Sequence, residues 1–522
     1  MTGPDITPGG EPGTPHPGRA GSPQGTEPGY AEPVDPWASA DATAAIVAEA
    51  FPATSPTWPD GPPTGHDERV PAYRGKLFWL VAAASAVVLG VAGALVVVFW
   101  PRYPALGFHA LSDPRRVAPA VPVTSSFAAA TVRGDRAFFA SVSDDGTLGV
   151  VAADTATGER LWGSPAAGTA EGWERFVALP DALVAVSAED DDHRRMVLLD
   201  PGTGKLLWER LIGGDDTVLF AGDTVVLADR EEDRLLGLDV RGRGRTRWEL
   251  PNPTDSSGPQ DTTILAATTP DDLAVSASTT GTPFAEPFDD DRRIVQVAED
   301  RSARVIDAGT GAVLVPSRQS VADPDDPVLA HDGRLIVAES DDAHRIVAYD
   351  LAKLGEPRVL YTAPDDDTRF EHLTPCGTDR VCAVQTAHSD AKTAQVVAVD
   401  VAEGGRRWAR ALADTNSLVP VGDSLLAAQN TSPARVSLLG PDGTIRWTRD
   451  GAAARLDGGN LLRFAKPLST SPDDPSVAGE HLGDEAVELG PLTGVRSATC
   501  AWDTAVLACV ADQDFVLRRF AG

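Results

Sequence analysis

The side chains with the clearest chemistry are four cysteines, Cys376, Cys382, Cys500 and Cys509. In each successive pair, the first cysteine belongs to one predicted strand and the second to the next. This shared placement favours two local disulfides, Cys376–Cys382 and Cys500–Cys509, among the three connectivities that four cysteines allow. Four reduced, buried thiols are the alternative. Because disulfides persist outside the cytosol, the pairing predicts an extracytoplasmic domain.

The sequence shows no other group of residues with the spacing of a metal site or a phosphate-binding loop. The cysteines lack the CxxC spacing of zinc sites, and the histidines are scattered singly, so no metal site can be assigned. The segment Gly202–Lys205 superficially resembles a phosphate-binding loop. However, that loop needs a Gly where Leu199 stands and a Ser or Thr where Leu206 stands, so a hairpin turn is the better interpretation. We therefore predict no catalytic and no cofactor-binding residue, and the metal sites stay unknown.

Acidic residues form a less ordinary pattern. They cluster repeatedly between the second and third strands of the predicted units and between units. Loops of these two kinds emerge on one face of a propeller. Solvated turns are one interpretation, and a negative platform for a cationic partner or Ca²⁺ is the other. The clusters are Asp144–Asp145, Glu189–Asp192, Glu231–Asp233, Asp289–Asp291 and Asp341–Asp342 within units, and Asp215–Asp216, Asp325–Asp326 and Asp365–Asp367 between them.

Charge and composition restrict the partners and divide the chain of 522 residues. The formal net charge is -31, which disfavours nucleic acid as a partner. Residues 1–71 are rich in Pro, Gly and acidic residues and contain almost no aliphatic clusters. Such a segment cannot bury enough apolar surface to offset its ordering entropy, so we predict a disordered tail.

An uncharged segment, residues 77–100, follows the tail. Its length is sufficient to span a hydrocarbon core of about 30 Å, and aromatic residues lie at both ends, as in interfacial belts. Arg74 and Lys76 precede it directly and favour a cytoplasmic N-terminus. We expect a single-pass protein of the plasma membrane with its C-terminal domain outside. Residues 101–125 are predicted to form a Pro-interrupted stalk, in which Val117–Val123 is a candidate closing strand.

From residue 126 to residue 522 one hairpin pattern recurs. Each copy has a short apolar run, an Asp, a turn with Gly, and a second run that ends on Trp or an aliphatic residue. Asp accepts backbone N–H groups two or three residues further on, and Gly supplies the positive φ of the turn. The Trp is expected to lie between neighbouring units with its N–H bonded to a backbone carbonyl. The copies are 152–162, 198–208, 237–248, 305–315, 348–360, 398–408 and 438–447.

A period of roughly 40 to 50 residues with several strands per unit indicates a β-propeller. The final run, from Ala498 to Phe520, holds only three strands, so we expect Val117–Val123 to complete the last blade and remove two open edges. The raw count is nine blades, but one weak repeat is interpreted as an insertion. The prediction is therefore an all-β, eight-bladed propeller, with seven or nine blades as alternatives.

The repeats resemble the tryptophan-docking motif of the pyrroloquinoline quinone (PQQ) propellers. The resemblance is strong in two or three blades and weaker elsewhere. WD-repeat propellers are the alternative fold, but they place Asp directly after Trp, whereas here Asp precedes Trp by about eight residues. The whole arrangement is similar to membrane-anchored PQQ-like proteins of actinobacteria. The residues that carry or extend the motif are Asp154, Gly158, Trp162, Asp200, Gly204, Trp208, Trp248, Asp400, Trp408 and Trp447.

The resemblance implies either a quinoprotein dehydrogenase or a non-enzymatic relative such as the outer-membrane assembly lipoprotein. Quinoprotein dehydrogenases resemble one another in a disulfide between adjacent cysteines that stacks on the cofactor, in a bound calcium and in a catalytic Asp. None of the four cysteines here are adjacent. We therefore expect a non-enzymatic binding or scaffolding module for an unknown protein partner, without PQQ or calcium as cofactors. A PQQ-dependent oxidoreductase is the alternative.

Overall fold

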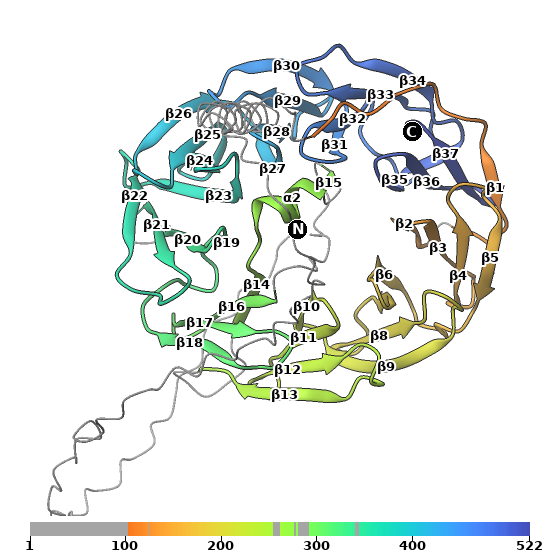
Figure 1. The fold of residues 1–522 in the computed structure, drawn as a ribbon, viewed down its shortest axis with the longest axis horizontal. Helices are drawn as coiled ribbons and strands as arrows, with labels where there is room; N and C mark the ends of the chain where they lie inside the picture. The colour runs from red at the N-terminus through yellow and green to blue at the C-terminus, as the bar shows by residue number, and fades with distance from the viewer. Residues whose placement is uncertain (1–102, 125, 254–261, 276–277, 280–291, 340–343) are drawn as a thin grey trace, which may run out of the picture. The chain divides into compact units, whose positions relative to one another are not determined.

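Each repeat forms one four-stranded antiparallel sheet, and the sheets follow one another as the blades of a ring (Figure 1). The computed structural model describes residues 103–124, 126–253, 262–275, 278–279, 292–339 and 344–522. The chain divides into two units, Met1–Val91 and Ala92–Gly522, and all described residues belong to the second. The predicted tail and the predicted span, 77–100, lie outside the described residues. No helix in the described part is long and apolar enough to cross a membrane.

Blades one to three each have four strands, paired in sequence order. Blade one has β2 (Ala128–Arg133), β3 (Arg136–Val142), β4 (Leu148–Asp154) and β5 (Arg160–Ser164). Blade two has β6 (Trp173–Ala178), β7 (Leu183–Ser187), β8 (His193–Leu199) and β9 (Leu206–Gly213). Blade three has β10 (Thr217–Ala221), β11 (Thr224–Asp229), β12 (Arg234–Asp239) and β13 (Thr246–Pro251).

Blade four contains an insertion between its first and second strands. It has β14 (Thr262–Ala266), β16 (Arg293–Ala298), β17 (Ala303–Asp307) and β18 (Val313–Arg318), with helix α2 (Pro270–Val275) and β15 (Ser278–Thr279) between β14 and β16. Blade five has β19 (Val328–His331), β20 (Arg334–Glu339), β21 (Arg345–Asp350) and β22 (Arg358–Thr362). Blade six has β23 (Thr368–Pro375), β24 (Arg380–Ala387), β25 (Asp390–Asp400) and β26 (Arg406–Ala411). Strand β15 pairs with the inner strand of blade eight, so the insertion reaches across the ring (Figure 1).

The last three blades complete the ring. Blade seven has β27 (Thr415–Val421), β28 (Ser424–Gln429), β29 (Arg435–Leu439) and β30 (Ile445–Asp450). Blade eight has β31 (Ala452–Arg455), β32 (Asn460–Phe464), β33 (Ser476–His481) and β34 (Val487–Pro491). Blade nine has β35 (Val495–Trp502), β36 (Val506–Ala511) and β37 (Phe515–Arg519), together with β1 (Arg115–Val117) from the start of the described chain.

The described residues thus form nine blades, and the prediction of eight is wrong. The most degenerate repeat, residues 455–492, is a complete blade in its own right. Its strands β31 to β34 pair in sequence order, although its final hairpin lacks the Asp and Trp of the motif. Strand pairing tolerates this loss because the backbone hydrogen bonds do not depend on those side chains.

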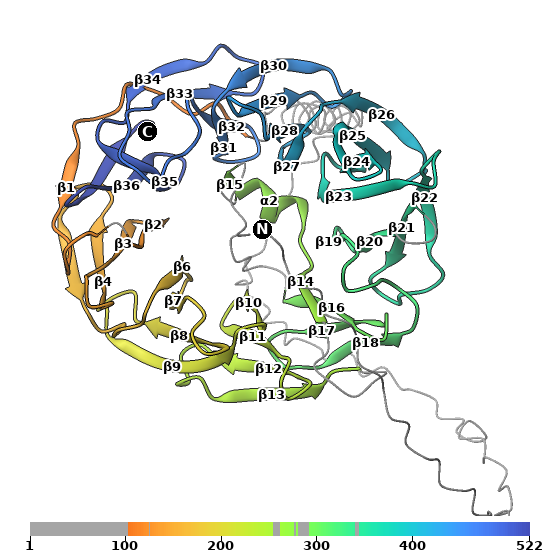
Figure 2. The ribbon, with the colours of Figure 1, turned by 180° about the vertical axis from the view of Figure 1, so that it is seen from behind.

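Ring closure is confirmed, but its register differs from the prediction. Strand β1 pairs with β37 through Arg115–Leu517, Arg116–Val516 and Val117–Phe515, and it forms the outer strand of blade nine (Figure 2). Of the predicted segment, Val117–Val123, only Val117 belongs to this strand. Pro119 and Pro122 lack the N–H that a paired strand must donate, so the pairing ends before them.

The hydrophobic core is divided among the interfaces between blades. Nine clusters of buried side chains lie one at each interface, including the one between blades nine and one. The second and third strands are buried on both faces, as in β3 and β4, which explains their continuous apolar runs. At the closing interface Phe139 and Phe515 stack with ring centroids 4.7 Å apart.

The repeat residues form the joints between neighbouring blades. Trp162 donates its indole N–H to the carbonyl of Pro201 at 3.1 Å, and its ring fills the space beside Gly204, where a Cβ would come within 2.4 Å. The pattern recurs from blade to blade, as predicted from the sequence. Trp208 donates to Val240 at 2.7 Å, Trp248 to Ala308 at 2.8 Å and Trp408 to Pro441 at 3.0 Å.

The aspartates of the motif fix the hairpins that receive these rings. Asp154 accepts the backbone N–H of Thr157 at 2.7 Å, and Gly158 has a φ of 73°. Asp200 accepts the hydroxyl of Thr203 at 2.8 Å. Asp400 accepts the N–H of Glu403 and also binds Arg407. These residues are therefore structural, and the hairpins of blades two, three, four and seven each place a Gly beneath the Trp of the preceding blade.

Candidate functional site

The two faces of the ring carry different connections. We call the face with the turns between first and second strands and between third and fourth strands the hairpin face. The face with the connections between second and third strands and between blades is the loop face. In an antiparallel blade, connections must alternate in this way. The two faces therefore present different sets of side chains.

Both predicted disulfides are present. Cys376 follows β23 and is linked to Cys382 in β24, with Cα atoms 5.7 Å apart, and Cys500 in β35 is linked to Cys509 in β36. Cys376 and Cys382 are 2% and 0% exposed, so a solvent reductant cannot reach their sulfur atoms in the folded protein. Both bridges join the first strand of a blade to its second. They are structural links, as their placement in the sequence indicated.

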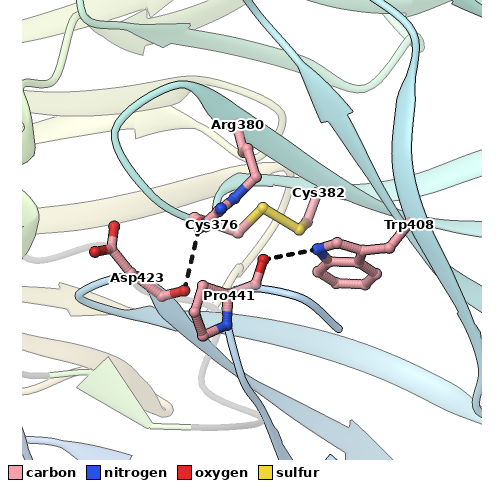
Figure 3. Close-up of a disulfide and its surroundings, with 6 residues drawn as sticks. All are labelled: Cys376, Arg380, Cys382, Trp408, Asp423 and Pro441. Carbon is pink, nitrogen blue, oxygen red and sulfur yellow. Dashed lines mark hydrogen bonds between the residues drawn. A yellow bond between two sulfur atoms is a disulfide. The ribbon is translucent and has the colours of Figure 1, made fainter. Parts of the chain in front are cut away.

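The first of these disulfides closes a turn that contacts blade seven (Figure 3). Arg380 donates from Nη2 to the carbonyl of Cys376 at 3.0 Å and to the carbonyl of Asp423 at 3.4 Å. On the other side, Trp408 of blade six donates to the carbonyl of Pro441. The bridge, the guanidinium and the indole thus hold the turns of blades six and seven in fixed positions on the hairpin face.

A pocket with a volume of about 390 Å³ lies beside this turn on the hairpin face. Its walls are main-chain turns from blades six, seven and eight, at Gly377, Gly422 and Gly458. A Cβ on Gly422 would lie 2.4 Å from the carbonyl oxygen of Gly458, so the absence of a side chain there lets these turns approach closely. Pockets of this size, with rigid walls and a few converging polar groups, are typical of ligand sites.

The polar groups of the pocket come from several blades. Asp423 and Arg446 belong to blade seven, Thr378 to blade six and His331 to blade five. His331 contacts Thr268, whose hydroxyl lies 2.9 Å from Nδ1. Burial lowers the pKa of His331, although Asp332 and Asp272 oppose the shift. His331 is therefore neutral over most of the physiological range. Sequence reasoning missed this pocket because its residues come from eight separated segments that share no motif.

The pocket also receives the first described residues of the chain. The ring of Tyr103 packs against Gly458, where a Cβ would lie 2.4 Å from it. Asn460 donates from Nδ2 to the carbonyl of Pro104 at 3.0 Å, and its Oδ1 accepts the N–H of Leu106 at 3.2 Å. The beginning of the predicted stalk, from Tyr103 to Leu106, is therefore held against blade eight.

One joint between blades departs from the repeat. Trp447 donates to the carboxylate Oε1 of Glu480 at 2.9 Å instead of to a backbone carbonyl. Arg463 lies 3.1 Å from Glu480 Oε2 and 5.5 Å from the centroid of the Trp447 ring. Glu480 is only 4% exposed, so its charge is compensated by this pairing. The sequence signal for this change was His481, which stands at the end of the third strand of blade eight where the motif has Asp.

The structure bears out most of the predicted acidic pattern. Asp144–Asp145, Glu189–Asp192 and Glu231–Asp233 lie between second and third strands, and the interblade clusters share their face. Two clusters, 289–291 and 341–342, are outside the described residues. The first of these follows β14 and precedes β16, so its assignment to a connection between second and third strands is wrong. The prediction failed because blade four has an insertion between its first and second strands, β14 and β16.

The residues do not fit the quinone site that the resemblance implies. In that site a disulfide between adjacent cysteines stacks on the cofactor, whereas these cysteines are six and nine positions apart and lie in blades six and nine. Within the described ranges, no group of three or more His, Cys, Asp or Glu side chains is placed to hold a metal ion. We derive no chemical step through PQQ from this arrangement.

The comparisons with known proteins agree with the repeat motif. Residues 144–281 match a family model described as outer membrane protein assembly factor BamB. No curated protein matches the sequence. Among solved structures, the chain is similar to BamB from Moraxella catarrhalis, at 14% identity over 80% of this chain and 100% of that one, with a TM-score of 0.40.

Two further similar structures belong to different classes of protein. One is a eukaryotic initiation factor, at 13% identity over 81% of this chain and 93% of that one, with a TM-score of 0.46. The other is a europium-containing methanol dehydrogenase, at 11% identity over 68% and 85%, with a TM-score of 0.34. At such low TM-scores, no statement about function rests on these likenesses.

Proposed function

The chain is a β-propeller protein built from PQQ-like repeats, and we propose that it is a membrane-anchored, extracytoplasmic binding module. On this proposal residues 77–100 cross the plasma membrane once, residues 1–71 lie in the cytoplasm, and the propeller binds a protein partner. The observation that carries the proposal is the pocket on the hairpin face. Its walls are fixed turns and its polar groups converge from several blades, whereas the cysteines are committed to structural bridges.

The location is supported by the two disulfides, which persist in oxidising compartments, and by the charges that flank the predicted span. Protease added to intact cells tests it. We expect the propeller to be digested and an epitope in the tail to be protected. Protection of the propeller with loss of the tail epitope would contradict this topology.

Binding at the pocket is tested by placing a photo-crosslinking residue at Thr378 in the full chain in membranes. We expect an adduct of one defined size that disappears when Asp423→Arg and Arg446→Glu are introduced together. The matched control is Asp484→Arg, an exposed charge in the hairpin of blade eight that does not line the pocket. An adduct that survives the pocket variant, or that the control removes equally, would argue against this site.

A separate measurement tests the alternative that the protein is a PQQ-dependent oxidoreductase. Purified full-length protein is titrated with PQQ in the presence of calcium, and the absorption spectrum of the quinone is followed. We expect no saturable change. A saturable spectral shift that the pocket variant abolishes would replace the binding-module proposal with a quinone-dependent one.

A further inference from the structure

Exposed aliphatic side chains are concentrated at one end of the outer strands. Seven large hydrophobic residues are between 42% and 50% exposed and stand at the first or second position of a fourth strand, directly after the hairpin. We call them the rim belt. An eighth exposed hydrophobic residue of the described part, Leu211, lies near the opposite end of its strand. The rim belt consists of Leu161, Leu206, Val313, Leu314, Val359, Ile445 and Val487.

Basic residues accompany the rim belt. Arg160, Lys205, Arg358 and Arg446 are exposed and adjacent in sequence to a residue of the belt. In the three blades without an exposed aliphatic residue there, arginines occupy the start of the outer strand, at Arg247 in blade three, Arg406 and Arg407 in blade six, and Arg115 and Arg116 in blade nine. The outer strands thus begin with exposed aliphatic side chains in six blades and with arginines in the other three, where Arg247, Arg407 and Arg116 pair with carboxylates.

The acidic clusters lie at the opposite end of the blades. Asp191 and Asp366, for example, are exposed in connections of the loop face. Single exposed aliphatic residues are normal on a soluble protein and need no explanation. Here, however, they recur in six blades at one end of the outer strand, next to cations. The hairpin face also carries single acidic residues, such as Asp154, Asp200 and Asp400, but these are hydrogen-bonded within their own hairpins.

The chain also approaches the propeller from the hairpin face. Tyr103 packs against the turn between β31 and β32. The chain then continues along blade nine, where His109 donates its backbone N–H to Phe520 at 2.9 Å and Ser112 donates to Arg519 at 2.9 Å. The uncharged segment 77–100 ends three residues before Tyr103. Three residues span at most about 11 Å, so a membrane that contains this segment must be close to the hairpin face.

We propose that the hairpin face rests on the surface of the lipid bilayer, with the rim belt and its cations in the headgroup region. Aliphatic side chains beside Arg and Lys suit this region, because the apolar parts leave water while the charges contact anionic headgroups. The loop face is then turned away from the negatively charged surface. This inference rests on the proposed membrane anchor, and it implies that a partner reaches the hairpin-face pocket from the membrane side.

Fluorescence quenching tests the orientation. The full chain is reconstituted in vesicles of phosphatidylcholine and phosphatidylglycerol, with a bimane label on one introduced cysteine at Leu206→Cys or Val359→Cys in the belt. Labels at Asp191→Cys and Asp366→Cys mark the loop face. Lipids that carry a nitroxide near the headgroup should quench the belt labels and leave the loop-face labels unchanged.

Charge reversal provides a matched pair of variants. Lys205→Glu together with Arg406→Glu should reduce quenching of the belt label at Val359→Cys, whereas Arg435→Glu, at the loop-face end of β29, should not. Flotation of the vesicles separates the possible failures. A chain that floats with unquenched belt labels, or with quenched loop-face labels, overturns the orientation and leaves the anchor intact. A chain that does not float overturns the anchor and the orientation together.

Discussion

At the scale of single residues, the ring depends on the contact between a tryptophan and the glycine of the next hairpin. Gly311 has a φ of 71°, and a Cβ there would lie 2.5 Å from the Trp248 ring. Gly333 has a φ of 72° but has open space where a Cβ would be. Gly333→Ala should therefore cost only the backbone strain, roughly 1–2 kcal/mol. Gly311→Ala adds the overpacking of the ring, about 1–3 kcal/mol more.

Urea unfolding of the two variants measures this difference. Equal losses of stability would show that the Trp ring moves aside without cost, and that the joint is less tightly packed than the structure indicates. The pair isolates the tryptophan contact because the two glycines share nearly the same φ.

Residue His331 predicts a pH dependence of stability. Burial holds its pKa in the folded protein below the ordinary value of about 6.5, so the unfolded chain binds more protons below that pH. Stability should therefore fall as the pH decreases through about 6.5, and the loss should level off once the folded histidine is also protonated. The same direction holds for His372, whose pKa is lowered by burial as well.

The variant His331→Gln tests this assignment, with unfolding measured between about pH 5 and 7. We expect the free energy of unfolding to depend less steeply on pH than in the wild-type protein. The pH dependence that remains is assigned to His372. The charged groups that face His331 are Asp332, Asp272 and Arg334. An unchanged slope would show that His331 does not contribute.

At the scale of elements, the strand pairing that closes the ring can be tested by deletion. Deleting residues Phe515 to Gly522 removes β37, which pairs with both β1 and β36. The deletion also removes Phe515, which is fully buried against Phe139. The loss of stability should exceed the approximately 3–5 kcal/mol expected for Phe515→Ala alone. The thermal unfolding transition of the whole ring should move to a lower temperature.

A suitable control is Arg116→Ala, which removes an exposed ion pair with Asp514 in the same joint. Exposed pairs of this kind contribute about 1 kcal/mol or less. Calorimetry compares the three proteins. If the truncated chain melts at the wild-type temperature, closure by β1 does not stabilise the ring.

The same joint shows how far the sequence determines the fold. Repeat spacing and hairpin chemistry correctly predicted the propeller architecture, the Trp contacts and both disulfides. The blade number was missed because blade eight keeps the strands but has lost the motif at its final hairpin. The closing strand was misplaced because prolines 119 and 122 limit pairing to the three residues before them. The pocket could not be predicted, since Thr378, Asp423 and His331 meet only through ring geometry.

At the scale of the whole molecule, the clustering of carboxylates on the loop face predicts a salt dependence. Asp190, Asp191 and Asp192 are exposed and consecutive on the loop face, and Asp191 and Asp192 have φ values of 47° and 61°. Asparagine tolerates this left-handed backbone well. Replacing all three by Asn therefore removes mutual repulsion without straining the turn.

We expect the triple Asn variant to be more stable than the wild type at about 0.01 M salt, where the Debye length is about 30 Å. The difference should be small, up to about 0.5 kcal/mol, and should vanish near 0.15 M salt, where the screening length is about 8 Å. The control is Asp145→Asn. Asp145 accepts the N–H of Thr147 and the hydroxyl of Ser143, and these bonds hold its pKa below the ordinary value. That variant should lose stability at both salt concentrations.

Calcium distinguishes screening from specific binding on the same face. Because no described group of three acidic or other ligating side chains is placed to hold a metal ion, calcium chloride and sodium chloride at equal ionic strength should shift the melting temperature equally. A larger shift with calcium that the triple Asn variant abolishes would instead establish a cation site at Asp190–Asp192. Equal shifts in both proteins would assign to these carboxylates only a long-range role, in which they keep the loop face of the propeller away from anionic surfaces.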